Sequence, residues 1–136
     1  MGLVIREYSK RDKRRESHKV AVHDGPHPVF TPQVLEMLEK NNASATFFLI
    51  GERVLLYPEL VARMKSAGHE VANHYFTNGS ALGHSNEEFL NNLEKTESAI
   101  GLTGTPKLFR PPGGIARPRQ LRLAEERAYT CVLGTA

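Results

Sequence analysis

From residue 19 onward, the sequence alternates short apolar runs with longer segments whose apolar residues recur at helical spacing. The clearest run, Ala-Thr-Phe-Phe-Leu-Ile at 45–50, has the length and composition of a buried strand, and Gly51 stops it. Short strands that alternate with helices are typical of βα units in a parallel sheet. The sequence therefore predicts an α/β fold with about five strands, at 19–23, 45–50, 69–72, 107–110 and 129–133.

Helices are predicted between these strands. Thr31 is expected to cap the first of them, with Pro32 in its first turn. Ser85 and Glu88 have the spacing of a capping box, which starts the third helix. The predicted helices lie between Thr31 and Asn41, between Pro58 and Gly68, from Ser85 to about Ile100, and over roughly 117–126.

The length of the chain restricts which α/β fold it can form. At 136 residues it is long enough for one domain with a core and too short for two. A closed eight-stranded β/α barrel needs about 200 residues or more, so we expect an open sheet, an incomplete barrel or a piece of something longer. Cys131 is the only cysteine, which excludes an intrachain disulfide and a cysteine-based zinc site.

Residues 1–18 are expected to form a basic, flexible N-terminal arm ahead of a domain at 19–136. This arm holds most of the basic excess behind the net charge of +3. A basic arm can contact phosphates, but a solvated terminus is the simpler interpretation, and nucleic acid is not an expected partner. No apolar window of about 20 residues predicts a membrane span. No signal-peptide pattern is visible, so a cytoplasmic location is the default expectation.

Polar side chains follow three of the predicted strands at their carboxyl ends. The first strand runs into His23 and Asp24, the third into His74, and the fourth into Arg110. The carboxyl ends of parallel strands meet at one edge of a sheet, where functional groups gather. Because Asp and His bind metal ions that activate water, the three strand ends are compatible with a hydrolytic metal site.

Each of these residues, taken alone, favours a structural role. Asp24, followed by Gly25 and Pro26, is compatible with a plain turn. A single His74 is more often a hydrogen-bonded structural histidine than a ligand, and Arg110 could pair with a surface carboxylate. Residue types and spacing therefore indicate a metal site without establishing one.

Five stretches, taken in order, resemble the polysaccharide deacetylases, the NodB-type domain of carbohydrate esterase family four. The resemblance runs from about residue 19 to about residue 133 and covers most of the chain. The matching stretches are Asp24–Pro26 followed by Phe30–Leu35, Ala45–Gly51, Gly68–His74, Phe109–Gly114 and Tyr129–Gly134.

The resemblance implies both a fold and a chemistry. The family fold is a distorted, incomplete (β/α) barrel, and its members remove N-acetyl or O-acetyl groups from chitin, chitooligosaccharides, peptidoglycan or xylan. A divalent metal, usually zinc, is held by one Asp and two His. A second Asp acts as general base, an Arg orients that base, and a His near the end of the chain acts as general acid.

Some of the family's roles carry over directly to this sequence. Asp24 matches the metal-binding Asp, and His74 matches the first metal-binding His. Arg110 matches the Arg that orients the base. The stretch Pro111-Pro112-Gly113 matches the motif that contacts the substrate, although many members carry a Tyr where this chain has Gly113.

Other family positions are changed. His23 stands where the family has its general-base Asp, and Asn78 stands where most members have the second metal-binding His. The late motifs, which include the catalytic His, are expected beyond Ala136. Asn is a poor ligand for a transition metal ion, so Asp24 and His74 leave two good ligands where catalytic zinc prefers three.

His23 and His27 leave several possibilities open. His23 could supply the third ligand, if the strand bends at Gly25-Pro26, or His27 could swing in. His23 could instead act as the base, since an imidazole with a pKa near ~6.5 accepts protons at neutral pH. Arg110 beside it would then lower its basicity.

Three functions remain open from the sequence. The first is a metal-dependent hydrolase of weak activity that deacetylates an oligo- or polysaccharide, with zinc as the expected metal. The second is an inactive family member that still binds carbohydrate. The third is a nucleic-acid or surface binder that uses the basic arm. An unpaired edge of the sheet also predicts low stability or self-association.

Overall fold

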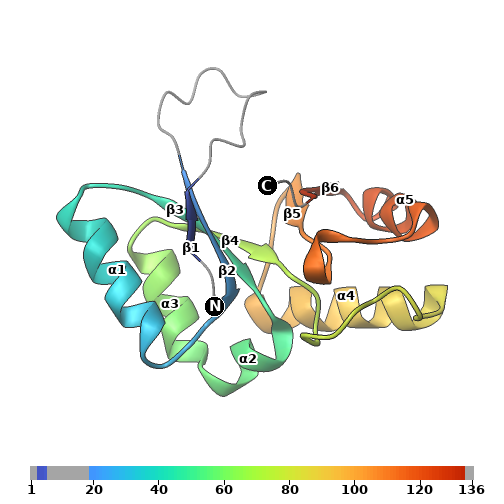
Figure 1. Ribbon diagram of the computed structural model, residues 1–136, viewed down its shortest axis with the longest axis horizontal. Helices are drawn as coiled ribbons and strands as arrows, with labels where there is room; N and C mark the ends of the chain where they lie inside the picture. Colours follow the sequence, from blue (N-terminus) through green and yellow to red (C-terminus); the bar gives the residue numbers. More distant parts are fainter. Residues whose placement is uncertain (1–2, 6–18, 134–136) are drawn as a thin grey trace.

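The computed structural model describes residues 3–5 and 19–133 of the chain, and its core is a six-stranded sheet in the order β1-β2-β3-β4-β5-β6 (Figure 1). The five strands from β2 to β6 are parallel, as predicted, and β1 pairs antiparallel with β2. The sheet is open, so the expected α/β fold of the incomplete-barrel type is confirmed. The strands are β1 (Leu3–Ile5), β2 (Val20–Gly25), β3 (Ala45–Leu49), β4 (Glu70–Asn73), β5 (Lys107–Phe109) and β6 (Tyr129–Cys131).

Strand β1 lies within the stretch that was expected to be an arm. Residues 3–5 pair with 20–22 of β2, and the sequence did not indicate this strand. The rest of the expected arm lies outside the described residues, and so does the proposal that it binds nucleic acid or a surface. Self-association through an edge of the sheet stays a prediction.

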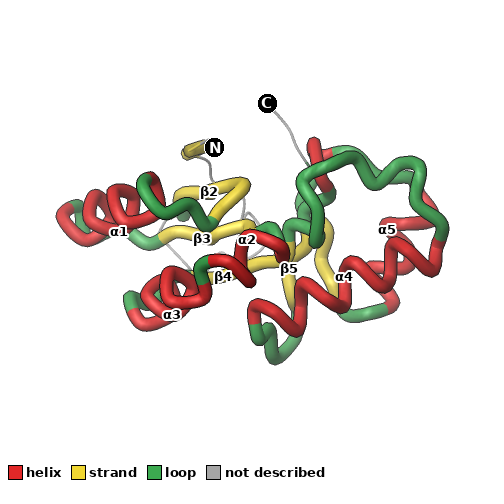
Figure 2. Tube along the Cα trace, turned by 90° about the horizontal axis from the view of Figure 1, so that it is seen from below, coloured by secondary structure: helices red, strands yellow, loops and turns green. Residues whose placement is uncertain are grey.

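Five α-helices and one short 3₁₀ helix connect the described strands. Figures 1 and 2 show α1 and α3 beside the β2–β4 part of the sheet, and α4 beside β5. In the parts of the chain that the structure describes, no helix is long and apolar enough to cross a membrane. The helices are α1 (Phe30–Lys40), α2 (Gly51–Leu56), α3 (Pro58–Ser66), α4 (Asn86–Ile100), η1 (Pro112–Gly114) and α5 (Pro118–Glu126).

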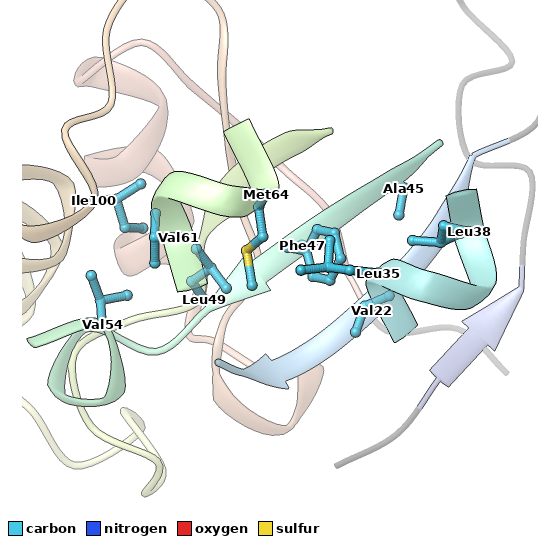
Figure 3. Close-up of a cluster of buried hydrophobic side chains, with 10 residues drawn as sticks. All are labelled: Val22, Leu35, Leu38, Ala45, Phe47, Leu49, Val54, Val61, Met64 and Ile100. Atoms are coloured by element: carbon cyan, nitrogen blue, oxygen red, sulfur yellow. The ribbon is translucent and has the colours of Figure 1, made fainter. Parts of the chain in front are cut away.

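The main core lies between the sheet and helices α1 to α4 (Figure 3). Alternate residues of a strand point to the same face, so Ala45, Phe47 and Leu49 of β3 all face these helices. Burying each large apolar side chain stabilises the fold by about 1.5–3 kcal/mol. The buried members of this cluster are Val22, Leu35, Leu38, Ala45, Phe47, Leu49, Val54, Val61, Met64 and Ile100.

Two further clusters of buried side chains are present. Ala21, Phe48 and Ala72 occupy the alternate positions of their strands and pack together. Another cluster lies along α4 and α5 and contains Tyr75, Ala81, Phe89, Leu93, Phe109, Ala124 and Tyr129. This second cluster surrounds the end of β4, where the candidate site begins.

Two helix starts show where local sequence signals succeed and fail. The capping box is confirmed: the Ser85 hydroxyl accepts from the Glu88 amide, and the Glu88 carboxylate accepts from the Ser85 amide, both at 3.1 Å. Thr31 is not a cap, because α1 begins at Phe30 and the Thr31 hydroxyl accepts from the His27 amide at 2.8 Å. A ring nitrogen of His27 instead receives the amides of Val29 and Phe30.

Helix α2 was not predicted, and its start explains why. It spans only six residues, and no side chain caps it. Its first two amides, those of Gly51 and Glu52, donate to the carbonyls of Tyr75 and Phe76. Since the cap comes from backbone groups distant in sequence, no local motif marks it.

The close contact between α2 and α4 makes Gly51→Ala a test of the packing. A Cβ atom at Gly51 would lie 2.6 Å from both the Phe76 ring and the Thr96 hydroxyl, so overpacking should lower the free energy of unfolding by about 1–3 kcal/mol. Gly79→Ala is the control, because a Cβ there meets nothing within 4 Å. Urea unfolding measures both variants, and equal midpoints would contradict this packing.

Candidate active site

Asp24 lies at a bulge near the carboxyl end of β2. The register between β2 and β3 shifts between His23 and Gly25, and Asp24 itself has a φ of 66°. This left-handed conformation is uncommon for a residue with a side chain. In a regular strand, adjacent residues point to opposite faces, but the bulge lets His23 and Asp24 both approach His74. The expected bend is therefore present, and it is centred on Asp24.

His74 follows β4 and links three strand ends through its two ring nitrogens. Its Nε2 atom lies 3.0 Å from Oδ1 of Asp24, at the end of β2. Its Nδ1 atom lies 2.7 Å from the backbone carbonyl oxygen of Arg110, just after β5. The residue is only 4% exposed. The structure thus brings Asp24 and His74, which are 50 residues apart, into direct contact.

The proton positions on this ring follow from its partners. A backbone carbonyl can only accept, so Nδ1 of His74 carries a proton and donates it to Arg110. In the neutral ring, the Nε2 lone pair then faces the Asp24 carboxylate. Two acceptor atoms at 3.0 Å need a positive centre between them, which is either a proton on Nε2 or a metal cation.

This geometry suits a pair of metal ligands. Zinc binds nitrogen and oxygen at about 2.0–2.2 Å, which places two ligands of a tetrahedral site about 3.3–3.6 Å apart. The 3.0 Å between His74 Nε2 and Asp24 Oδ1 is slightly shorter, so a small outward shift of the two side chains would admit the ion. Metal-binding histidines commonly donate their other N–H to a backbone carbonyl, as His74 does to Arg110. Their role as ligands nevertheless stays a prediction.

The contact with His74 also affects the charge on Asp24. The hydrogen bond from His74 lowers the pKa of the Asp24 carboxyl, and burial of the carboxyl partly opposes this. Electrostatic interactions with His74 and His23 lower the pKa of Asp24 further. Both effects favour the anionic form of Asp24 in the metal-free protein.

A third strong ligand is not in place. Within residues 3–5 and 19–133, no group of three or more His, Cys, Asp and Glu side chains is arranged to hold a metal ion. The ring of His23 stacks on Phe48 at 5.1 Å, and its centroid is 6.0 Å from that of His74. His23 is thus a neighbour of the pair, and the two-ligand site expected from the sequence stays a prediction.

His27 and Asn78 do not join the contact between Asp24 and His74. His27 uses Nδ1 to accept the first amides of α1 and stacks on Phe30 at 4.6 Å. Swinging it toward Asp24 would break both interactions. Asn78 lies in an exposed stretch of the loop after β4, whereas His74 is buried.

The stretch after β5 forms one wall of the site. Arg110 is half-buried, and its backbone carbonyl binds His74. Pro111 and Pro112 are buried, and Gly113 is exposed with a φ of 67°. This left-handed conformation favours glycine over the Tyr of many family members. The assigned roles of Arg110 in catalysis and of residues 111–113 in substrate binding stay predictions.

Asn73 is the residue that sequence reasoning missed. It is the last residue of β4, is fully buried, and hydrogen bonds to α4 and β6. The one signal in the sequence is a polar residue at the end of a strand whose preceding neighbours are apolar. That signal also fits an exposed strand end, so it does not identify the role.

Comparison with known proteins identifies the family. Residues 10–132 match the family model described as polysaccharide deacetylase, and the chain belongs to this family. The match begins before residue 19, where the domain was expected to start. A peptidoglycan-N-acetylglucosamine deacetylase of Bacillus cereus is 39% identical over 115 residues, which are 84% of this chain and 54% of that protein. The chain thus spans about half the length of that relative.

Solved structures agree with this assignment. A mutant of BA3943, described as a CE4 family pseudoenzyme with restored enzymatic activity, matches with a TM-score of 0.74 and 28% identity, over 83% of this chain and 42% of that one. A family 4 acetyl xylan esterase from Clostridium thermocellum, in complex with a cobalt ion, matches with a TM-score of 0.70 and 32% identity, over 76% of this chain and 52% of that one. The family therefore includes metal-bound esterases and pseudoenzymes.

The lowered pKa of Asp24 makes the acid stability of the metal-free protein testable. A carboxyl whose folded-state pKa is lowered stabilises the fold above its unfolded-state pKa of about 3.9, and this contribution is lost as the pH falls through the folded-state pKa. We expect Asp24→Asn to be less stable than wild type at pH 7, with the difference shrinking below about pH 4. Urea unfolding in EDTA across this range measures it.

Glu126→Gln is the control for this experiment, because it removes an exposed carboxylate of α5 that has no contact with His74. A stability difference between wild type and Asp24→Asn that stays constant from pH 7 into the acid range would contradict the lowered pKa.

Proposed function

We propose that the chain is a metal-dependent carbohydrate deacetylase of low activity, which removes acetyl groups from an N- or O-acetylated oligo- or polysaccharide. The observation that carries the proposal is the pair formed by His74 Nε2 and Asp24 Oδ1 at 3.0 Å, with Nδ1 of His74 fixed by the Arg110 carbonyl. Membership of the polysaccharide deacetylase family supports the reaction class.

Asp24 and His74 would hold the metal, for which we propose zinc. A bound divalent cation would polarise the acetyl carbonyl and lower the pKa of a bound water. The Arg110 carbonyl would keep the His74 ring oriented for it, as the 2.7 Å hydrogen bond indicates. The part of the site that receives the acetyl group would be lined by Pro111, Pro112 and Gly113.

Two features account for the low activity that we propose. Two strong protein ligands bind zinc more weakly than the usual three of catalytic sites. An imidazole, His23, takes the place of the family's carboxylate base. His23 can accept a proton near neutral pH, but its ring is committed to a stack on Phe48.

A second function is a family member without activity that binds carbohydrate. The stack between His23 and Phe48 favours it, because a ring held at 5.1 Å and 19° packs like a core side chain. Similarity to wild-type BA3943 of Bacillus anthracis, which is described as a CE4 family pseudoenzyme, points the same way.

Metal content and acetate release distinguish these functions. The purified protein is offered zinc, cobalt or nickel, and bound metal is measured by mass spectrometry. Acetate is then measured after incubation with N-acetylated chitooligosaccharide, peptidoglycan and acetyl xylan. Metal-dependent acetate release supports the enzyme, whereas oligosaccharide binding without release supports the inactive binder. Absence of metal binding contradicts the proposed enzyme.

Restoring the changed positions should raise metal affinity and activity. Asn78→His adds an imidazole on the loop after β4 and should tighten zinc binding by at least about tenfold. His23→Asp should raise the rate of acetate release from the metal-loaded protein, because a carboxylate base suits Arg110 as its partner. Isothermal titration and an acetate assay measure the two effects.

Thr103→His is the matched control. It places an imidazole on an exposed loop that leads into β5, at the opposite end of the sheet from the site. Equal zinc affinity of the Asn78→His and Thr103→His variants would show that residue 78 lies outside the metal site.

A further inference from the structure

The side chain of Asn73 lies directly before His74 and is fully buried. Its Nδ2 atom donates to the Leu93 carbonyl of α4 and to the Tyr129 hydroxyl of β6, both at 2.9 Å. Its Oδ1 atom accepts from the backbone amide of Tyr75 at 2.9 Å. A single carboxamide therefore joins the end of β4 to a helix, to a strand and to the segment that follows His74.

The bond from Tyr75 to Asn73 closes a turn around His74. An Asn side chain that accepts the amide two residues ahead forms an Asx turn, and His74 is its central residue. Tyr75 has a φ of 71°, so the chain changes direction immediately after the turn. On the side of β3, the His74 amide donates to the Leu49 carbonyl at 2.9 Å. The backbone of His74 is thus held by β3 and by the Asn73 side chain.

The groups that hold Asn73 are themselves anchored. The Tyr129 hydroxyl donates to the Glu97 carboxylate at 2.7 Å, and Lys107 Nζ lies 3.1 Å from the same carboxylate oxygen. Burial raises the pKa of Tyr129, so its hydroxyl keeps the proton that it donates to Glu97. The hydroxyl oxygen then accepts from Asn73, and both Nδ2 protons of Asn73 have acceptors.

The three hydrogen bonds of the Asn73 carboxamide act at different places. The bonds to Leu93 and Tyr129 satisfy the Nδ2 donors, while the bond to Tyr75 sets the main chain on the far side of His74. The His74 side chain projects from that main chain. The bond from Tyr75 to Asn73 thus lies beside the residue whose Nε2 atom contacts Asp24 Oδ1 at 3.0 Å.

We propose that Asn73 is a positioning residue for His74: its carboxamide, held by the Leu93 carbonyl and the Tyr129 hydroxyl, closes the turn that aims His74 Nε2 at Asp24. This inference deepens the proposed function and rests on it where metal binding is concerned. Loss of a group that orients a metal ligand commonly weakens metal binding by about 10–100-fold.

Two substitutions of Asn73 separate the turn from the other bonds. Asn73→Ala removes every side-chain hydrogen bond at this position. Asn73→Ser is the conservative variant, because a hydroxyl can accept the amide two residues ahead, although more weakly than an Asn side chain. We expect zinc affinity to fall by about 10–100-fold in Asn73→Ala and to be partly recovered in Asn73→Ser.

A matched pair of hydroxyl deletions tests the support from β6. Tyr129→Phe and Thr96→Val each remove one buried hydroxyl that donates to a residue of α4. The Tyr129 hydroxyl donates to the Glu97 carboxylate, and the Thr96 hydroxyl donates to the Asn92 carbonyl. Only the Tyr129 hydroxyl contacts Asn73. Both variants should melt at a lower temperature, but only Tyr129→Phe should weaken zinc binding by the folded protein. Equal zinc affinity in the Asn73→Ala variant and in wild type would overturn the proposal.

A readout without metal keeps this test separate from the proposed function. In the metal-free protein, nitrogen NMR of the His74 ring reports whether Nδ1 carries a hydrogen-bonded proton. We expect that signature in wild type, in Asn73→Ser and in Thr96→Val, and its loss in Asn73→Ala. If wild type binds no zinc, the proposed enzyme fails while the ring signature still decides the role of Asn73. An unchanged signature in Asn73→Ala overturns that role.

Discussion

The two hydrogen bonds of the His74 ring are the interaction on which the candidate site depends. They connect the ends of β2 and β5 through a residue that follows β4. Two other features of the site support this connection. The bulge at Asp24 turns the carboxylate toward the ring. The hydrogen bonds of the Asn73 side chain hold the backbone next to His74.

The fold was largely predictable because its signals are local. The apolar run at 45–50, the capping box at Ser85 and the alternation of strands with helices each follow from neighbouring residues, and the structure confirms them. The exceptions share one cause. Helix α2 is capped by the carbonyls of Tyr75 and Phe76, and β1 gains its partner only through pairing with β2. Neither set of hydrogen bonds can be inferred from the residues adjacent to the element in the sequence.

The candidate site was predictable in part, and for a different reason. Asp24 and His74 were singled out by their places after strands and by resemblance to a family, and the parallel sheet does bring them together. The direction of each ring could not be read from the sequence. Nδ1 of His27 accepts the amides at the start of α1, and Nδ1 of His74 donates to the Arg110 carbonyl. Main-chain groups thus compete with other side chains for these rings. Asn73 was missed since its partners are distant in sequence.

The backbone cap of α2 ties that helix to the loop that leaves the site. The carbonyls of Tyr75 and Phe76, the residues directly after His74, receive the first amides of α2. The helix and the loop therefore share one boundary. Because both bonds join main-chain groups, a loop taken from another family member would have to keep the backbone path of residues 75 and 76, whatever its side chains, for α2 to keep its start.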